Sequence, residues 1–183
     1  MVRSLELFGS LVLFGLIVMV LGLSFLALVA PVGARSDTFF SAVPDNLKSV
    51  LAQATRAGKQ GVLVLFELQG CGECRKVKDT VLRDPAVQDF YRRHFLSVSL
   101  DLTGSTPLID FKGNTVKHIE FALANRVQAA PTFIFYGADG EPVTRFAGLV
   151  RDAGEFLQLG RYVAEAAYEN APFRAYQLRQ SVP

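Results

Sequence analysis

Two cysteines separated by two residues are the only thiols of the chain, and they form the motif Cys71-Gly72-Glu73-Cys74. A cysteine thiolate attacks disulfide sulfur, and a second thiol nearby can displace the mixed disulfide that results. The spacing therefore predicts thiol–disulfide exchange as the chemistry of this chain. In that hypothesis Cys71 attacks a partner and Cys74 resolves the intermediate, with no metal and no cofactor beyond the redox-active disulfide itself.

Two other uses of the motif are open but less favoured. A zinc site needs four ligands, and only His94 and His118 could add nitrogen donors to the two cysteines. A static disulfide across so short a loop adds little stability by chain entropy. We expect neither histidine to be catalytic, because His94 follows a helix and His118 begins a surface helix.

The segments around the motif place it where a strand ends and a helix begins. Residues 62–68 are almost continuously apolar, which is typical of a central strand buried on both faces. Residues 71–83 have apolar side chains at helical spacing. Because a helix N-terminus stabilises negative charge, we expect the pKa of Cys71 to lie below that of a free cysteine.

The other segments alternate between helical and strand patterns. The expected elements are helices at 45–57, 84–93, 116–126 and about 152–170, a strand at 96–102, a loop or small hairpin at 103–114, and a hairpin of strands at 132–136 and 142–146. A parallel pair around the motif joined to an antiparallel hairpin predicts an α/β fold with a mixed central sheet flanked by helices.

The N-terminal part of the chain differs from the rest. Residues 7–30 carry no charge and exceed the roughly 20 residues that cross a bilayer. This favours an uncleaved anchor, although the small residues at 32–34 also fit signal-peptidase cleavage. We expect an N-terminal membrane anchor or signal peptide at 1–35, a domain at 36–170 and a loosely held tail at 171–183. Either N-terminal interpretation puts the domain outside the cytosol, where disulfide chemistry is common.

Length and charge are compatible with this division. The 183 residues suffice for one well-filled domain and an extra segment. The net charge of +2 gives no indication of a nucleic-acid partner. In the linker before the domain, we expect Phe39 and Phe40 to pack onto it.

These motifs resemble the thioredoxin superfamily. The Cys71–Cys74 motif follows the first central strand, and Ala130-Pro131-Thr132 precedes the hairpin, where thioredoxins carry a cis-proline beside their cysteines. The resemblance implies a thioredoxin fold, here preceded by an N-terminal hydrophobic helix. It also implies that Ala130, Pro131 and Gly70 bind an extended segment of the substrate.

Four stretches, at 66–74, 82–87, 110–113 and 130–140, resemble the periplasmic thioredoxins of sulfur-oxidation gene clusters, the SoxW type. This resemblance implies a reductase of periplasmic client proteins, supplied with electrons by a membrane thiol transporter of the DsbD or CcdA kind. Clients could be sulfur-carrier proteins or apocytochromes c. Residues 7–30 would tether the domain to the inner membrane.

The chain departs from thioredoxin at several positions. Gly70 stands where thioredoxin has tryptophan, and Leu65 stands where it keeps a buried aspartate. Glu67 is the nearest acid and faces the same side of the strand as residue 65, so it is a possible proton acceptor for Cys74. These differences leave the net direction open. A disulfide oxidase or isomerase, or a non-enzymatic copper or chaperone module, remains an alternative.

Overall fold

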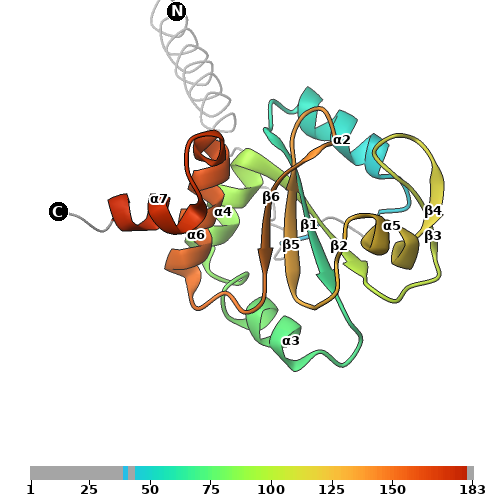
Figure 1. The fold of residues 1–183 in the computed structure, drawn as a ribbon, viewed down its shortest axis with the longest axis horizontal. Helices are drawn as coiled ribbons and strands as arrows, with labels where there is room; N and C mark the ends of the chain where they lie inside the picture. Colours follow the sequence, from blue (N-terminus) through green and yellow to red (C-terminus); the bar gives the residue numbers. More distant parts are fainter. Residues whose placement is uncertain (1–38, 41–43, 181–183) are drawn as a thin grey trace, which may run out of the picture. The chain divides into compact units, whose positions relative to one another are not determined.

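A mixed four-stranded sheet with the order β2-β1-β5-β6 forms the centre of the domain (Figure 1). Its strands are β1 (Gly61–Glu67), β2 (Phe95–Asp101), β5 (Thr132–Tyr136) and β6 (Pro142–Ala147). Strands β1 and β2 are parallel, whereas β5 is antiparallel to both β1 and β6. The expected parallel pair joined to an antiparallel hairpin is therefore confirmed.

The structure is a computed structural model that describes residues 39–40 and 44–180. The expected hydrophobic helix at 7–30 lies outside these residues. Among the described helices, none is long and apolar enough to span a membrane. The domain belongs to the second of two compact units, which covers residues 37–183.

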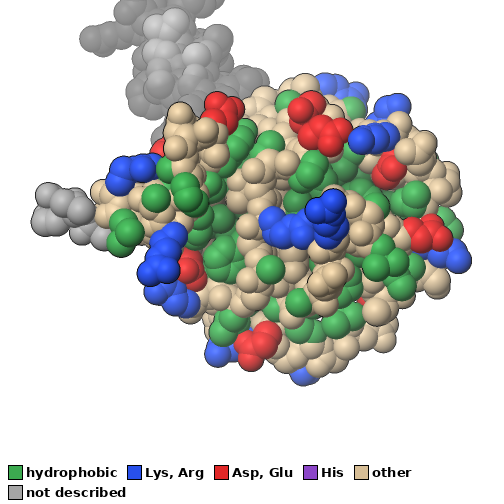
Figure 2. All heavy atoms as spheres, in the orientation of Figure 1, with side chains coloured by type: hydrophobic (Ala, Val, Ile, Leu, Met, Phe, Trp, Pro, Cys, Tyr) green, Lys and Arg blue, Asp and Glu red, His purple; other side chains and the backbone are tan. Residues whose placement is uncertain are grey.

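Helices cover the sheet and connect its strands. They are α2 (Leu47–Arg56), α3 (Gly72–Asp79), α4 (Pro85–His94), α5 (His118–Ala124), α6 (Ala153–Ala164), the 3-10 turn η2 (Ala167–Glu169) and α7 (Phe173–Gln180). The face of the domain drawn in Figure 2 carries acidic and basic side chains interspersed with apolar ones. Charge of either sign is therefore spread over this face.

The two faces of β1 belong to two different hydrophobic clusters. Leu63 and Leu65 pack in the cluster that also contains side chains of α4 and α6. Val64 and Phe66 pack in the other cluster, with side chains of α2 and α5. Because both faces of β1 are buried from Gly61 to Phe66, a polar side chain would reach water only at its last residue, Glu67. This explains the continuous apolar run in the sequence.

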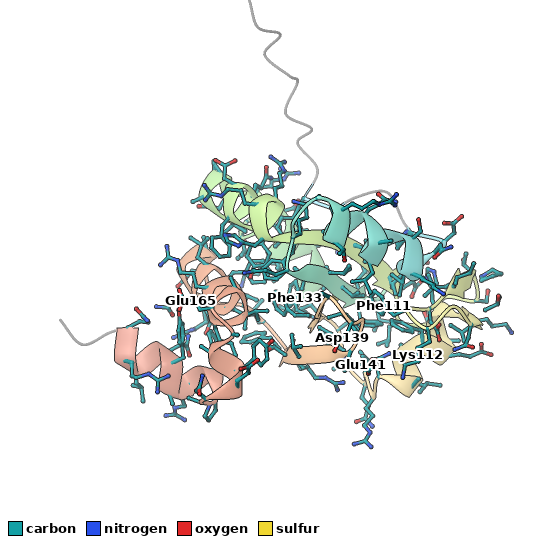
Figure 3. All side chains as sticks on the ribbon, turned by 90° about the horizontal axis from the view of Figure 1, so that it is seen from above. Phe111, Lys112, Phe133, Asp139, Glu141 and Glu165 are labelled. Carbon is teal, nitrogen blue, oxygen red and sulfur yellow. A yellow bond between two sulfur atoms is a disulfide. The ribbon has the colours of Figure 1, made fainter. Side chains whose placement is uncertain are left out.

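A separate two-stranded sheet pairs β3 (Pro107–Ile109) with β4 (Thr115–Lys117). The helix expected at 116–126 begins only at His118, as α5, because residues 116 and 117 belong to β4. Strand β3 and the turn after it lie in the segment 103–114 expected to form a loop or small hairpin. This turn is joined to the turn between β5 and β6 by an ion pair, in which Lys112 Nζ lies 3.2 Å from Glu141 Oε1. Both residues are labelled in Figure 3, which also places Phe133 within the central layer.

The cysteine-bearing helix α3 ends at Asp79, four residues earlier than expected. The Thr80 hydroxyl donates to the carbonyl oxygen of Lys76 at 2.8 Å, and a turn follows. Helix α4 then restarts as expected, because the Asp84 carboxylate accepts from the first backbone N–H groups and Pro85 occupies the first turn.

Phe39 and Phe40 pack onto the domain as expected. Phe39 is 9% exposed, and its ring centroid lies 5.5 Å from that of Tyr91 and 6.2 Å from that of Phe156. Phe40 packs beside it against the same cluster. These aromatic contacts fix the beginning of the domain against α4 and α6.

The prediction of a loosely held tail is wrong for residues 173–180, which form α7. Tyr176 is buried, and its hydroxyl donates to Glu165 Oε2 at 2.9 Å. The ring of Tyr162 on α6 contacts both Phe173 and Tyr176. The sequence signal for this helix is the pair of aromatic residues three positions apart, which puts both on one side of a helix.

Candidate active site

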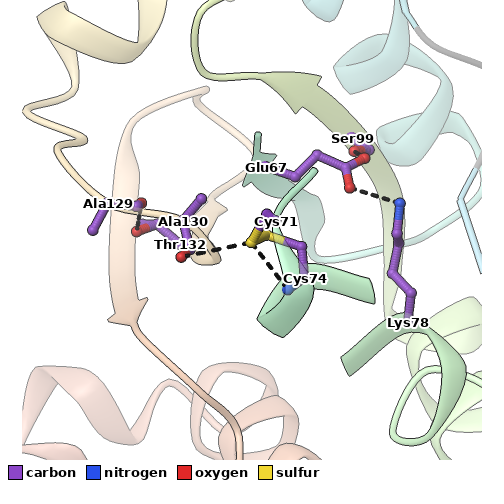
Figure 4. The surroundings of a disulfide bond; sticks show 8 residues. All are labelled: Glu67, Cys71, Cys74, Lys78, Ser99, Ala129, Ala130 and Thr132. Carbon is purple, nitrogen blue, oxygen red and sulfur yellow. Dashed lines mark hydrogen bonds and ion pairs between the residues drawn. A yellow bond between two sulfur atoms is a disulfide. The ribbon is translucent and has the colours of Figure 1, made fainter. Parts of the chain in front are cut away.

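The cysteine motif lies where β1 ends and α3 begins, as the sequence predicts. Cys71 is the N-cap residue of α3 and forms a disulfide with Cys74, with the two Cα atoms 5.3 Å apart (Figure 4). The backbone N–H of Cys74 donates to Cys71 Sγ at 3.1 Å. In the reduced protein, the same N–H and the positive end of the helix would stabilise a thiolate at Cys71.

The two sulfurs differ in access. Cys71 is partly exposed, whereas Cys74 is only 2% exposed beneath the first turn of α3. A large partner can therefore reach Cys71 first. This geometry is what the predicted roles require, with Cys71 as the attacking thiol and Cys74 as the resolving thiol.

Antiparallel pairing of β5 with β1 brings the Ala130–Pro131 segment beside the cysteines. The peptide bond between these two residues is cis. The carbonyl oxygen of Ala130 lies 3.9 Å from Cys71 Sγ, a contact rather than a hydrogen bond because a disulfide sulfur carries no proton. The turn is held by Thr132, whose hydroxyl donates to the Ala129 carbonyl at 2.7 Å. Ala130 and Pro131 are thus placed as the resemblance to thioredoxins implies.

Gly70, the third predicted substrate-binding residue, is exposed directly before Cys71 and has a φ of +74°. A Cβ atom added there would meet nothing within 4 Å. The space beside the disulfide is therefore open at the position where thioredoxins carry a tryptophan.

Glu67 ends β1, and its side chain lines the same cleft as Cys71 and Cys74. Lys78 Nζ lies 2.6 Å from Oε2, and the hydroxyl of Ser99 donates to Oε1 (Figure 4). Lys78 is four residues after Cys74 on α3, hence one turn further along the helix. Sequence reasoning missed Lys78 and Ser99 as partners of Glu67, although the helical spacing of Lys78 from Cys74 was a usable signal.

A cleft of about 510 Å³ runs along this side of the disulfide. Its walls combine the cysteines with polar and charged residues: Glu67, Cys71, Cys74, Arg75, Lys78, Ser99, Asp101, Thr106 and His118. Within the part of the chain that the structure describes, no group of three or more His, Cys, Asp or Glu side chains is arranged to hold a metal ion.

The two histidines have different surroundings. His94 ends α4 and stacks on Phe90 with ring centroids 4.4 Å apart, and burial lowers its pKa. His118 begins α5 as expected, and this helix has an exposed face, but the His118 side chain itself is only 4% exposed and lines the cleft. Its spacing from Phe121 and Ala122, three and four residues on, is that of one buried helix face and could have revealed this.

Comparison with known proteins agrees with this geometry. The sequence profile of the thioredoxin-like domain matches residues 47–164. No curated protein is significantly similar to the chain in sequence.

Three solved structures share the fold. Thioredoxin from Thermus thermophilus is 29% identical over 69% of this chain and 88% of its own, with a TM-score of 0.53. A putative disulphide-isomerase from Bacteroides thetaiotaomicron is 20% identical over 73% of this chain and 96% of its own, with a TM-score of 0.53. A thioredoxin-fold protein from Helicobacter pylori is 19% identical over 63% of this chain and 80% of its own, with a TM-score of 0.53. With its mixed sheet, its helix-start disulfide and a family profile that spans most of the described domain, the chain belongs to the thioredoxin-like domain family.

Proposed function

We propose that this protein is a thiol:disulfide oxidoreductase that reduces disulfides in client proteins outside the cytosol. The observation that carries the proposal is the Cys71–Cys74 disulfide itself, with its accessible sulfur at a helix N-terminus and its second sulfur buried. Such a pair can cycle between dithiol and disulfide without any other group.

In the first step the Cys71 thiolate attacks one sulfur of a client disulfide. A bond forms between Cys71 and that sulfur, the client disulfide breaks, and its other sulfur leaves as a thiolate that takes up a proton. The carbonyl of Ala130, beside Cys71, can accept an N–H from an extended client segment. This contact aligns the client sulfur with the attacking thiolate.

In the second step Cys74 loses its proton and attacks Cys71 Sγ, which releases the second client thiolate. Two electrons have then passed from the cysteine pair to the client, and the protein is left with the disulfide found here. Glu67, in the same cleft as Cys74, would accept the Cys74 proton, with Lys78 and Ser99 holding its carboxylate in place. A dithiol donor must then reduce the disulfide again, and for this we propose a membrane thiol transporter of the DsbD or CcdA kind.

The direction of exchange is tested by the reduction potential of the purified domain, measured against glutathione or dithiothreitol buffers. A reductase should lie near −270 mV, the value of thioredoxin, whereas a strong oxidase lies near −120 mV. We expect a value near the thioredoxin end. A potential near −120 mV would replace the reductase proposal with net oxidation.

The role of Glu67 is tested by Glu67→Gln. Removal of a proton acceptor should slow the resolution step at pH 7 by about 100-fold, the lower end of the range for general base catalysis. The decay of a preformed mixed disulfide at Cys71 reports this step directly. Glu73→Gln is the matched control, because Glu73 is an exposed carboxylate between the two cysteines on α3 and does not line the cleft. Equal slowing in both variants would remove Glu67 from the mechanism.

We further propose a location in the periplasm, with residues 7–30 tethering the domain to the inner membrane, and clients of the kind served by SoxW-type thioredoxins. The proposal rests on the uncharged run at 7–30 and on the sequence resemblance. Carbonate washing of membranes and mass spectrometry of the mature N-terminus test the tether. A mature chain that begins at Arg35 would instead mean a soluble periplasmic protein, and a full-length cytosolic chain would contradict export.

A further inference from the structure

His118 is a buried polar side chain that the exchange steps above do not use. It is 4% exposed, and neither Nδ1 nor Nε2 has a hydrogen-bond partner. Buried polar groups in folded proteins are almost always paired, so each exception needs an explanation. Here the unpaired ring lines the cleft that also contains Cys71 and Cys74.

The segment 102–106 covers the ring. A Cβ atom added at Gly104 would lie 3.1 Å from His118 Nδ1, so the chain passes close to the imidazole at a residue without a side chain. Backbone bonds join this segment to α5: His118 N–H donates to the Thr106 carbonyl at 3.2 Å, and Ile119 N–H donates to the Gly104 carbonyl at 3.0 Å. These bonds use the backbone of His118 and leave both ring nitrogens unsatisfied.

The nearest acid does not pair with the ring. Asp101 Oδ1 accepts from both the backbone N–H and the hydroxyl of Thr103, each at 2.9 Å. Its negative charge acts on His118 only at a distance and opposes the effect of burial, which lowers the pKa of His118. The ring is therefore neutral near pH 7, with one nitrogen that donates and one that accepts.

The cleft is lined by equal numbers of positively and negatively charged side chains. Arg75 and Lys78 contribute positive charge, and Glu67 and Asp101 contribute negative charge. A neutral imidazole among balanced charges is poorly suited to select an ion. It is well suited to an uncharged amide, which carries one acceptor and one donor in the same plane.

We propose that His118 is a specificity-determining residue of a second client subsite, which takes an uncharged amide group of the client next to the cysteine joined to Cys71. The proposal rests on the proposed function. Because the strand order is β2-β1-β5, the Ala130 edge and the end of β2 at Asp101 lie on opposite sides of β1, so a client would be held on both sides of the disulfide.

A client group can enter this subsite beside Gly70, where no side chain blocks the cleft. Solvent does not reach either ring nitrogen in the free oxidised protein, so binding requires segment 102–106 to move away from the imidazole. Because the side chains of Thr103, Ser105 and Thr106 are exposed, an outward shift of these three residues would break the two backbone bonds to α5 without removing their side chains from the core.

The test compares two disulfide probes. One is a peptide with a single cysteine, activated as a mixed disulfide with 5-thio-2-nitrobenzoate, that carries glutamine after the cysteine. The other is hydroxyethyl disulfide, which is too small to occupy the cleft and Cys71 together. With His118→Leu we expect kcat/KM for the peptide to fall about tenfold, which corresponds to about 1.4 kcal/mol. The rate with hydroxyethyl disulfide should stay within about twofold.

Two further variants sharpen the result. His118→Gln keeps a donor and an acceptor and should restore most of the peptide rate. His94→Phe is the matched control, because His94 does not line the cleft, and both of its rates should stay unchanged. If His118→Leu slows both probes equally or slows neither, the subsite does not exist. If the unmodified protein fails to reduce hydroxyethyl disulfide, the proposed function fails instead.

Thermal unfolding separates a binding role from a structural one. Because leucine removes two unsatisfied nitrogens, the melting temperature of His118→Leu should stay equal or rise by roughly 2–4 °C. A second measurement avoids the substitution: the imidazole ¹⁵N shifts of His118 are recorded in Cys74→Ser before and after it is trapped with the glutamine peptide. A shift of one ring nitrogen supports the subsite, and unchanged shifts overturn it.

Discussion

Cys71→Ser should reduce disulfide exchange to the uncatalysed background, a loss on the order of 10³-fold or more. A serine hydroxyl is not ionised at neutral pH, so the N–H of Cys74 and the positive end of α3 would have no thiolate to stabilise. Reduction of insulin in the presence of dithiothreitol measures the loss. Residual activity close to that of the unmodified protein would mean that Cys71 is not the nucleophile.

Cys74→Ser is the matched variant, and we expect it to stop the exchange after the first attack rather than before it. Attack by Cys71 remains, but the buried group that resolves the intermediate is gone, so mixed disulfides with clients should accumulate. These adducts should be visible on non-reducing gels of intact cells and should disappear in the double variant with Cys71→Ser. Accumulation in Cys71→Ser alone would reverse the two assignments.

The position of the cysteines could be predicted from the sequence because the signals that define it are local. A strand must be apolar wherever helices cover both of its faces, and residues 62–66 satisfy this. The cap of α4 at Asp84-Pro85 is equally local, since both residues act within one helical turn. Ala130 and Pro131 are far from the cysteines in sequence and were identified only through the resemblance to thioredoxins.

The remaining walls of the site could not be predicted in the same way, because they depend on tertiary packing. Ser99 approaches Glu67 only because β2 pairs with β1 in parallel register, where Leu65 lies opposite Ser99. The spacing of His118 with Phe121 and Ala122 indicates a buried helix face, but the sequence does not show that segment 102–106 folds over the ring, because a loop has no periodic pattern. Helix α7 likewise packs through Phe173 and Tyr176 against Tyr162 of α6. The spacing within one helix does not show which residue of another helix it contacts.

Gly61→Ala should destabilise the domain more than any ordinary surface substitution, by about 3 kcal/mol or more in the free energy of unfolding. A Cβ atom at Gly61 would lie 1.9 Å from the carbonyl oxygen of Tyr136 and 3.0 Å from its carbonyl carbon. The clash is with backbone, so no side-chain rotation can relieve it. Because β1 pairs with β5 from Val62 onward, relief would require the two central strands to separate at this end.

Urea unfolding of the oxidised domain measures the effect, which should correspond to a melting temperature lower by roughly 10 °C. Gly72→Ala is the control: it lies at the first position of α3, its φ is not positive, and an added Cβ would meet nothing within 4 Å. Since alanine restricts the unfolded chain and favours helix, Gly72→Ala should be neutral or stabilise the domain by up to about 1 kcal/mol. Equal stability of the two variants would show that β1 and β5 do not approach as closely as the structure places them, and the position of Ala130 beside Cys71 would then need revision, because it depends on the same strand pairing.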